Sequence, residues 1–233
     1  MISCPVCGKN FNISGEGIFE CPACLSGFSV RLLSGFNVWD RRRETGFFRA
    51  FTISVCRITA EPFIFFNAVK TESSVWPAFL FCFMVFFSAA LIKFAAYEVP
   101  AFLGLSFLAG PAEHLPEFLF RISSALIQPL KMLLITVFKA SALHICIILF
   151  GGKGSVGSTF RIVLYSSVAY FALLIPVVGA LVSLCWEIWL YMEGFHVAHN
   201  IPRSRSAWAV MFPILVFMLF VILGLLVFFS LTI

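Results

Sequence analysis

The sequence contains little charge. Only 12% of its 233 residues are Asp, Glu, Lys or Arg, and 61% are hydrophobic, whereas soluble domains contain roughly 25% charged residues. A chain with so few charged side chains cannot cover its apolar surface in water, which excludes an ordinary soluble domain. The apolar residues, 30 of them phenylalanine, lie in long runs without strand-like alternation. These runs predict helices that face lipid.

Several functional signals are also missing. Met1–Cys7 leads into a polar segment and not into the apolar core of a secretory signal peptide, so we expect the N-terminus in the cytosol. No Ser/His/Asp or Cys/His constellation is recognisable, so the sequence predicts no enzyme. The net charge of +5 does not predict nucleic-acid binding, because the basic residues flank apolar segments, as membrane topology requires.

Four of the eight cysteines form two C-x2-C pairs. Cys4 and Cys7 make the first pair, Cys21 and Cys24 make the second, and 13 residues separate the pairs. Two such pairs aim four thiolates at one point and close a tetrahedral site for structural Zn2+, with no open position for water or substrate. Iron or a redox dithiol would use the same residues but is less favoured. Residues 1–33 are therefore predicted to be a small β zinc ribbon that folds largely on metal binding.

The ribbon is expected to contain short strands, which lie at Phe11–Ile13, Ile18–Glu20 and Phe28–Leu32.

Residues 34–74 are predicted to be a basic linker followed by an amphipathic helix. Arg41-Arg42-Arg43 suits anionic cytoplasmic lipid or acts only as a topology signal. Within Gly46–Ala60, bulky apolar side chains are expected to share one helical face: Phe47, Phe48, Phe51, Val55 and Ile58. Such a helix lies in the bilayer interface or packs on the transmembrane bundle, and the sequence favours neither alternative.

Residues 75–233 are predicted to form an all-α polytopic membrane domain. Within the uncharged stretch Ile162–Trp186, Pro176–Gly179 either interrupts one span or turns between two. A hairpin keeps Lys153 and Arg203 on the same side, as the positive-inside rule prefers. We therefore expect five spans, of which the third and fourth form a short hairpin, with the C-terminus outside. The spans are placed at about 75–96, 125–150, 159–175, 178–192 and 207–231.

This order of features resembles the Yip1 domain family. The segments that carry the resemblance are Gly151–Ser155, Thr159–Tyr165, Ile175–Gly179 and, less strictly, Gly194–His199. The resemblance covers about residues 46–233 and is strongest over 151–199. It implies five spans with a cytosolic N-terminus, and bacterial members often carry a zinc ribbon in front. Eukaryotic relatives are linked to Rab GTPases, vesicle traffic and membrane shaping.

Polar residues within the predicted spans are candidates for a site in the membrane. Lys139, His144 and Glu187 lie inside apolar runs, where charged groups are unfavourable and usually face the bundle interior. They form an ion path or ligand site, or they are satisfied packing contacts. We expect Lys139 nearer the midplane than Glu187, so that the two pair only if their depths match.

Two further clusters lie at the cytosolic ends of the predicted spans. Gly151, Gly152, Lys153 and Gly154 are predicted to form a tight loop, because the phosphate-loop pattern and its preceding strand are absent. Glu193, His196 and His199 recur every third residue and are a weak second metal candidate, with ordinary interfacial polarity as the alternative.

The features together predict a membrane adaptor or organiser of the Yip1 type in the bacterial inner membrane. Its cytosolic zinc ribbon would bind an unidentified cytosolic protein, with a trafficking-like role, while the spans contact the lipid bilayer. A homo-oligomer is also compatible with the sequence. The alternative is a small transporter or channel that uses Lys139, His144 and Glu187.

Overall fold

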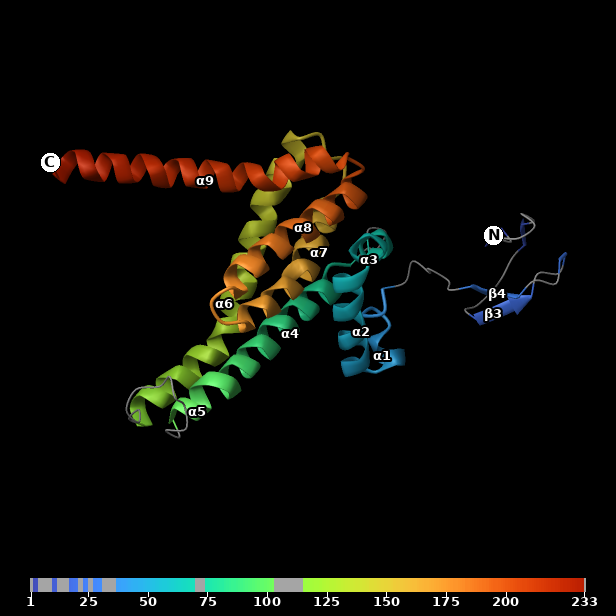
Figure 1. Cartoon of the computed structure of the whole chain (residues 1–233), viewed down its shortest axis with the longest axis horizontal. Coiled ribbons are helices and arrows are strands. Elements are labelled where there is room, and N and C mark those ends of the chain that lie inside the picture. Colours follow the sequence, from blue (N-terminus) through green and yellow to red (C-terminus); the bar gives the residue numbers. More distant parts are fainter. Residues whose placement is uncertain are drawn as a thin grey trace. The chain divides into compact units, whose positions relative to one another are not determined.

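The structure is a computed structural model of the chain. It describes residues 2–3, 10–11, 17–20, 23–24, 27–30, 37–69, 74–102 and 115–232. The chain divides into two compact units, residues 1–36 and residues 37–233. The N-terminal unit contains short strands, and the second unit is helical (Figure 1).

Two antiparallel strand pairs are described in the N-terminal unit. Strand β1 (Ile2–Ser3) pairs with β2 (Asn10–Phe11), and β3 (Gly17–Glu20) pairs with β4 (Gly27–Val30). The segment predicted as a strand at Ile18–Glu20 therefore lies in β3 and pairs with β4, which overlaps the strand predicted at Phe28–Leu32. Cys4, Cys7 and Cys21 lie outside the described residues, and Cys24 lies in an exposed turn at residues 23–24.

The second unit is built from helices that differ widely in length. In chain order they are α1 (Arg42–Thr45), α2 (Phe47–Ala60), α3 (Pro62–Val69), α4 (Trp76–Lys93), the π-helix η1 (Phe94–Glu98), α5 (Val99–Phe102), α6 (Leu115–Leu149), α7 (Val156–Tyr165), the 3-10 helix η2 (Ser166–Leu174), α8 (Gly179–His199) and α9 (Arg203–Thr232). In Figure 1, α4, α6, α7 and α8 lie together in one bundle, and the C-terminal half of α9 extends away from it.

Four helical segments of the described part are long and apolar enough to cross a membrane. They are Trp76–Ala96, Phe118–Leu149, Val156–Leu174 and Arg203–Ser230. The 21-residue α8, predicted as the fourth of five spans, is not among them. Its sequence includes Glu187 and Glu193, whose charges lower its hydropathy.

Helix α6 extends beyond the predicted second span at its N-terminal end. Helix α6 begins at Leu115 and its apolar segment at Phe118, whereas the sequence suggested a start near residue 125. Arg121 consequently lies in the first turns of this helix. The charged residues near this end, Glu117 and Arg121, mark the border of the apolar run, but both residue types are good helix formers, so the helix continues through them.

The chain reverses direction between η2 and α8. A turn at residues 176–178 follows the end of η2, and Val177 adopts a left-handed φ of 67° there. Gly179 begins α8 against the backbone carbonyl of Ala172, where a Cβ atom would collide with the oxygen. Helix α8 then returns along α7 and η2, packing most extensively on η2. The glycine thus permits the close approach of the two arms.

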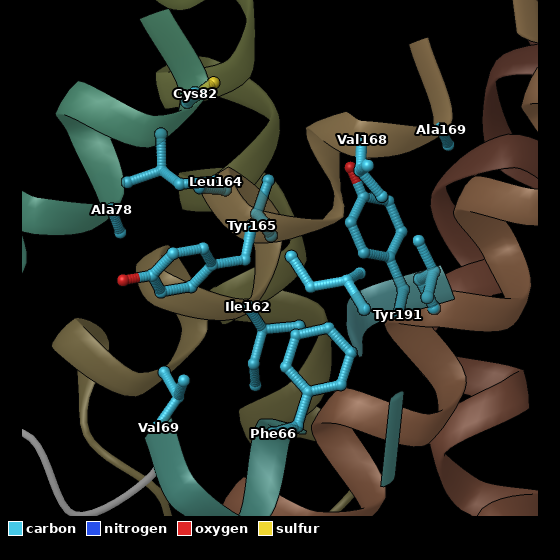
Figure 2. Close-up of a cluster of buried hydrophobic side chains, with 14 of the residues drawn as sticks. Phe66, Val69, Ala78, Cys82, Ile162, Leu164, Tyr165, Val168, Ala169 and Tyr191 are labelled. Carbon is cyan, nitrogen blue, oxygen red and sulfur yellow. The ribbon is translucent and has the colours of Figure 1, made fainter. Parts of the chain in front are cut away.

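Tyr165 lies at the centre of the buried core (Figure 2). Its ring centroid lies 5.1 Å from those of Phe65 and Phe81, so α3, α4 and α7 meet around it. Its hydroxyl accepts a hydrogen bond of 2.6 Å from the Asn37 side-chain amide. The phenol is buried because the polar Asn37 satisfies it.

Trp39 anchors α2 to the bundle. Its side chain is fully buried, its Nε1–H donates to the Pro77 carbonyl over 2.6 Å, and its ring contacts those of Phe47, Phe51 and Phe81. Of the two alternatives for the amphipathic helix, the structure therefore selects packing on the bundle. Of the predicted apolar face, Phe47, Phe51, Val55 and Ile58 pack against the bundle, whereas Phe48 is 76% exposed.

Helix α9 is apolar but has little contact with the bundle along its C-terminal half. Only 6% of its most apolar stretch is buried within the chain. The large side chains between Phe217 and Phe229 are exposed. A helix that is apolar on all sides and unburied by its own chain is typical of a segment surrounded by lipid.

Candidate functional site

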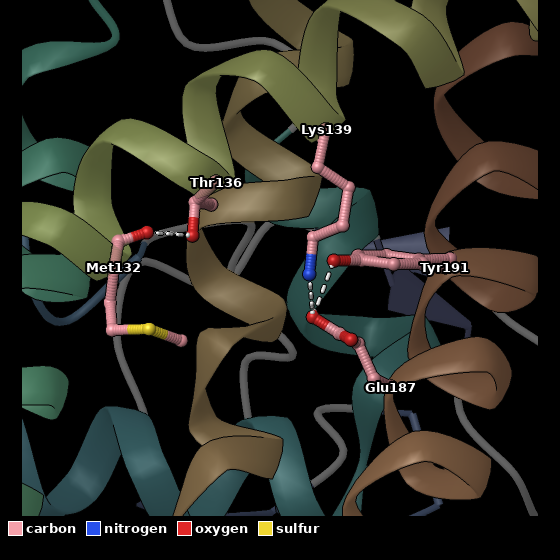
Figure 3. A network of polar contacts seen from close by, with 5 residues as sticks. All are labelled: Met132, Thr136, Lys139, Glu187 and Tyr191. Carbon is pink, nitrogen blue, oxygen red and sulfur yellow. Dashed lines mark hydrogen bonds and ion pairs between the residues drawn. The ribbon is translucent and has the colours of Figure 1, made fainter.

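Lys139 and Glu187 form an ion pair that joins α6 to α8 (Figure 3). The Tyr191 hydroxyl, one turn further along α8, donates to the same carboxylate oxygen over 2.6 Å. The Lys139 ammonium also lies 5.4 Å from the centre of the Tyr191 ring. The two charged groups are in direct contact, so they meet the condition of matching depth on which the predicted pairing depended.

A cavity of about 280 Å³ lies beside this pair, between α6, α8 and α9. Apart from Lys139, Glu187 and Tyr191, its lining is apolar, for example Leu184, Ile188 and Phe217. The carboxylate accepts from both neighbours, so its charge is compensated within the bundle. The arrangement can therefore fix α8 against α6 without leaving an isolated charge in the membrane.

A chain of hydrogen bonds connects His144 and His199 through Thr159. Gly154 N–H, which can only donate, lies 3.1 Å from His199 Nδ1, so this nitrogen accepts. A neutral His199 then carries its proton on Nε2 and donates to Thr159 Oγ1 over 2.9 Å. Thr159 in turn donates to His144 Nδ1 over 2.8 Å. His144, predicted as part of a site with Lys139 and Glu187, thus belongs to this second network.

The glycine loop after α6 packs directly on His199. A Cβ atom at Gly154 would lie 2.7 Å from His199 Nδ1, and one at Gly152 would lie 2.8 Å from the Ile147 carbonyl oxygen. Gly151 has a φ of 89°, a conformation that favours glycine. Ser155 ends the loop as the N-cap of α7, accepting from Ser158 N–H. Gly154 is therefore required by the close approach of the loop to α8, Gly152 by its packing on α6 and His199, and Gly151 by its backbone conformation.

His199 is the last residue of α8 and lies beyond its apolar part. It lies at the end of the bundle where the Gly151–Ser155 loop joins α6 to α7. Its side chain is almost fully buried. Burial first, and the neighbouring His144 second, lower the pKa of His199 to about 4 from its ordinary value of 6.5. The imidazole is accordingly neutral near pH 7, as the hydrogen bond from Gly154 requires.

The structure does not bring Glu193, His196 and His199 together. Glu193 pairs with Arg203 at 3.0 Å, and His196 Nδ1 donates to the Ile201 carbonyl over 2.6 Å. His199 is engaged with Thr159 and Gly154. Within the described residues, no group of three His, Cys, Asp or Glu side chains is arranged to hold a metal ion.

Three residues that make key polar contacts were not predicted from the sequence. Tyr191 and Thr159 complete the polar contacts of Glu187 and of the two histidines, and Trp39 docks the segment before α2. The contact of Tyr191 with Glu187 could have been predicted from the sequence, because residues four apart on a helix are neighbours. Thr159 and Trp39 carry no such local signal, since their partners are distant in sequence.

Comparisons with known proteins agree with this architecture. The model of the Yip1 domain matches residues 57–225, which include α4, α6, α7 and α8. No curated protein and no solved structure matches the chain. Since the family model covers most of the sequence and the matched region contains apolar helices long enough to span a bilayer, this chain is an integral membrane protein of the Yip1 domain family.

Proposed function

We propose that this protein is a membrane-embedded adaptor or organiser whose N-terminal zinc ribbon binds a cytosolic protein. The observation that carries the proposal is the division of the chain into a small cysteine-bearing unit, residues 1–36, and a separate membrane unit, residues 37–233. A protein that only conducted solutes would not need a separate unit with a closed, non-catalytic metal motif.

The described strands suit a structural Zn2+ held by Cys4, Cys7, Cys21 and Cys24. The connection from β1 to β2 contains the first C-x2-C pair, and the connection from β3 to β4 contains the second. Each pair thus lies where an antiparallel strand pair reverses, which is the position of a zinc knuckle. A metal held by four thiolates would supply folding energy and no reaction step.

The membrane unit is proposed to cross the bilayer five times, with α8 as the additional crossing. At about 1.5 Å per residue, residues 179–192 extend about 21 Å, short of the ~30 Å hydrocarbon core, so this crossing requires local thinning of the bilayer. Its Glu187 is compensated by Lys139. We take residues 179–192 as the crossing, which leaves His199 outside it.

The proposed orientation places the N-terminus in the cytosol and the C-terminus outside, in a bacterial inner membrane. Lys153 N–H bonds to the His199 carbonyl, and Arg203 pairs with Glu193. These contacts place the α6–α7 loop and the α8–α9 connection at one end of the bundle. The cationic residues of both connections would then face the cytosol, as the positive-inside rule requires.

The contacts of Lys139 favour an anchoring role over solute conduction. Its charge is paired with Glu187, and the adjoining cavity is mainly apolar. His144, the third member of the proposed transport set, bonds to Thr159 and not to either charged residue. Among the described residues, these contacts form no continuous polar path for an ion or solute.

The adaptor proposal is tested by affinity capture of the full-length protein from its own membranes with a crosslinker. Cys4→Ser/Cys7→Ser removes half of the thiolates, and Cys56→Ser/Cys185→Ser is the matched control because both of its residues lie outside the motif and are exposed. We expect the first variant to lose bound zinc and a cytosolic partner that the control retains. An identical set of captured proteins for both variants would contradict the adaptor role.

A further inference from the structure

A second cavity, of about 420 Å³, lies between α4, α6 and η2. Two cationic residues line it, Lys93 from α4 and Arg121 from α6. Ser124, Gln128 and Tyr170 add hydroxyl and amide groups, and none of the described lining residues is acidic. The described lining therefore combines two cationic side chains with three polar ones, whereas the cavity beside Glu187 is mainly apolar.

The cavity lies where three apolar segments approach the same membrane boundary. Lys93 is the last residue of α4, Arg121 lies near the start of α6, and Leu174 ends η2. This end is opposite to the Gly151–Ser155 loop, which follows the other end of α6. In the proposed topology it faces outward, where the positive-inside rule does not account for Lys93 and Arg121.

An apolar cavity of about 170 Å³ adjoins the cationic one along the contact of α4 with α6. The two cavities share Ala90, Phe94 and Ala125 in their linings. The remaining lining of the smaller cavity is Phe87, Leu91, Ile122 and Leu126, all apolar. A cavity lined by two cationic side chains beside an apolar cavity matches a molecule with an anionic head and a hydrocarbon tail.

We propose that these two cavities bind one anionic phospholipid, with its phosphodiester between Lys93 and Arg121 and an acyl chain along the smaller cavity. Basic pockets between transmembrane helices recognise anionic headgroups because two cations stabilise the phosphate where water is scarce. Gln128 and Tyr170, whose polar atoms lie 3.5 Å apart, face the same cavity and can donate to ester or glycerol oxygens. Free phosphate would satisfy the cations but not the apolar chamber.

Native mass spectrometry of the full chain in neutral detergent tests the proposal. Dioleoyl phosphatidylglycerol and dioleoyl phosphatidylcholine are titrated separately, and the first bound lipid is counted. We expect the wild type to bind phosphatidylglycerol about tenfold more tightly than phosphatidylcholine, and Lys93→Gln/Arg121→Gln to lose this preference. Lys131→Gln is the matched control, because Lys131 is an exposed lysine of α6 outside the cavity lining.

Ser124→Phe fills the larger cavity without changing its charge. It tests lipid binding there even if Lys93→Gln/Arg121→Gln does not fold. We expect it to abolish the preference for phosphatidylglycerol. Retention of that preference by Ser124→Phe or by Lys93→Gln/Arg121→Gln would overturn the proposal. Displacement of phosphatidylglycerol by millimolar inorganic phosphate would also overturn it, since a free anion would then be the ligand.

Discussion

Lys139 on α6 and Glu187 on α8 form an ion pair within the helix bundle, and Tyr191 donates to the same carboxylate. Removing one charge leaves the other unpaired in a region of low dielectric. We therefore expect Glu187→Gln to lower the free energy of unfolding by about 2–4 kcal/mol. Lys139→Met/Glu187→Leu, which removes both charges, should be less destabilising than either single change.

Thermal unfolding of the wild type, Lys139→Met, Glu187→Leu and Lys139→Met/Glu187→Leu in detergent, combined in a double-mutant cycle, measures this coupling. Additive effects of the two substitutions would mean that the pair contributes nothing. Flux of ions or protons in liposomes is the companion measurement. The anchoring role predicts no flux for the wild type or for Glu187→Gln.

His199 predicts a pH dependence of stability. Its pKa is about 4 in the folded protein and 6.5 for the ordinary side chain, so between these values the unfolded chain binds more protons. Stability should therefore fall as the pH drops from about 6.5 towards about 4, by an amount on the order of 2 kcal/mol. The helical circular dichroism signal, which reports the membrane unit, measures this against temperature at each pH. His199→Asn should flatten the slope, whereas His196→Asn should keep it.

The tight packing of Gly154 against His199 predicts that adding one methyl group there lowers the stability of the protein. In Gly154→Ala the new Cβ would lie 2.7 Å from His199 Nδ1, so the loop must shift and the bond from Gly154 N–H weakens. We expect a loss of about 1–3 kcal/mol. Gly224→Ala is the matched control, because nothing lies within 4 Å of its added Cβ. Equal unfolding temperatures for the two variants would contradict the tight packing of the loop.

Chelation of metal is expected to unfold residues 1–33 and to leave the helices of the membrane unit intact. The reason is that a ribbon with little apolar core depends on its metal for stability. Amide chemical-shift dispersion of the N-terminal unit, together with the helical signal of the whole chain, measures both effects. A ribbon that keeps dispersed amide signals without metal would argue against structural zinc.

A reporter fused after Ile233 should read as extracytoplasmic. Five crossings from a cytosolic N-terminus place the C-terminus on the opposite side. Paired alkaline phosphatase and fluorescent protein fusions make this measurement. A cytosolic signal would mean an even number of crossings and would remove α8 or another segment from the membrane.

Much of the membrane unit was predictable from local pattern. The apolar run after Trp76 and the break at Pro176–Gly179 correspond to α4 and to the turn before α8. Hydropathy and helix-breaking residues act over a few turns, so they can be read along the chain. Helix α6 begins at Leu115, ten residues before the predicted second span, because the charged residues there end the apolar run without ending the helix.

The sequence by itself determined that this is an integral membrane protein, because one soluble fold cannot bury 61% hydrophobic residues arranged in long runs. It also determined the family, through motifs contained within about fifty residues. Only the tertiary structure decided which partners the polar residues take: Lys139 with Glu187, His144 with Thr159, and Trp39 with Pro77. Such pairs depend on how each helix is rotated and how deep it lies in the bundle. Packing between helices decides both, and no periodic pattern in the sequence reports them.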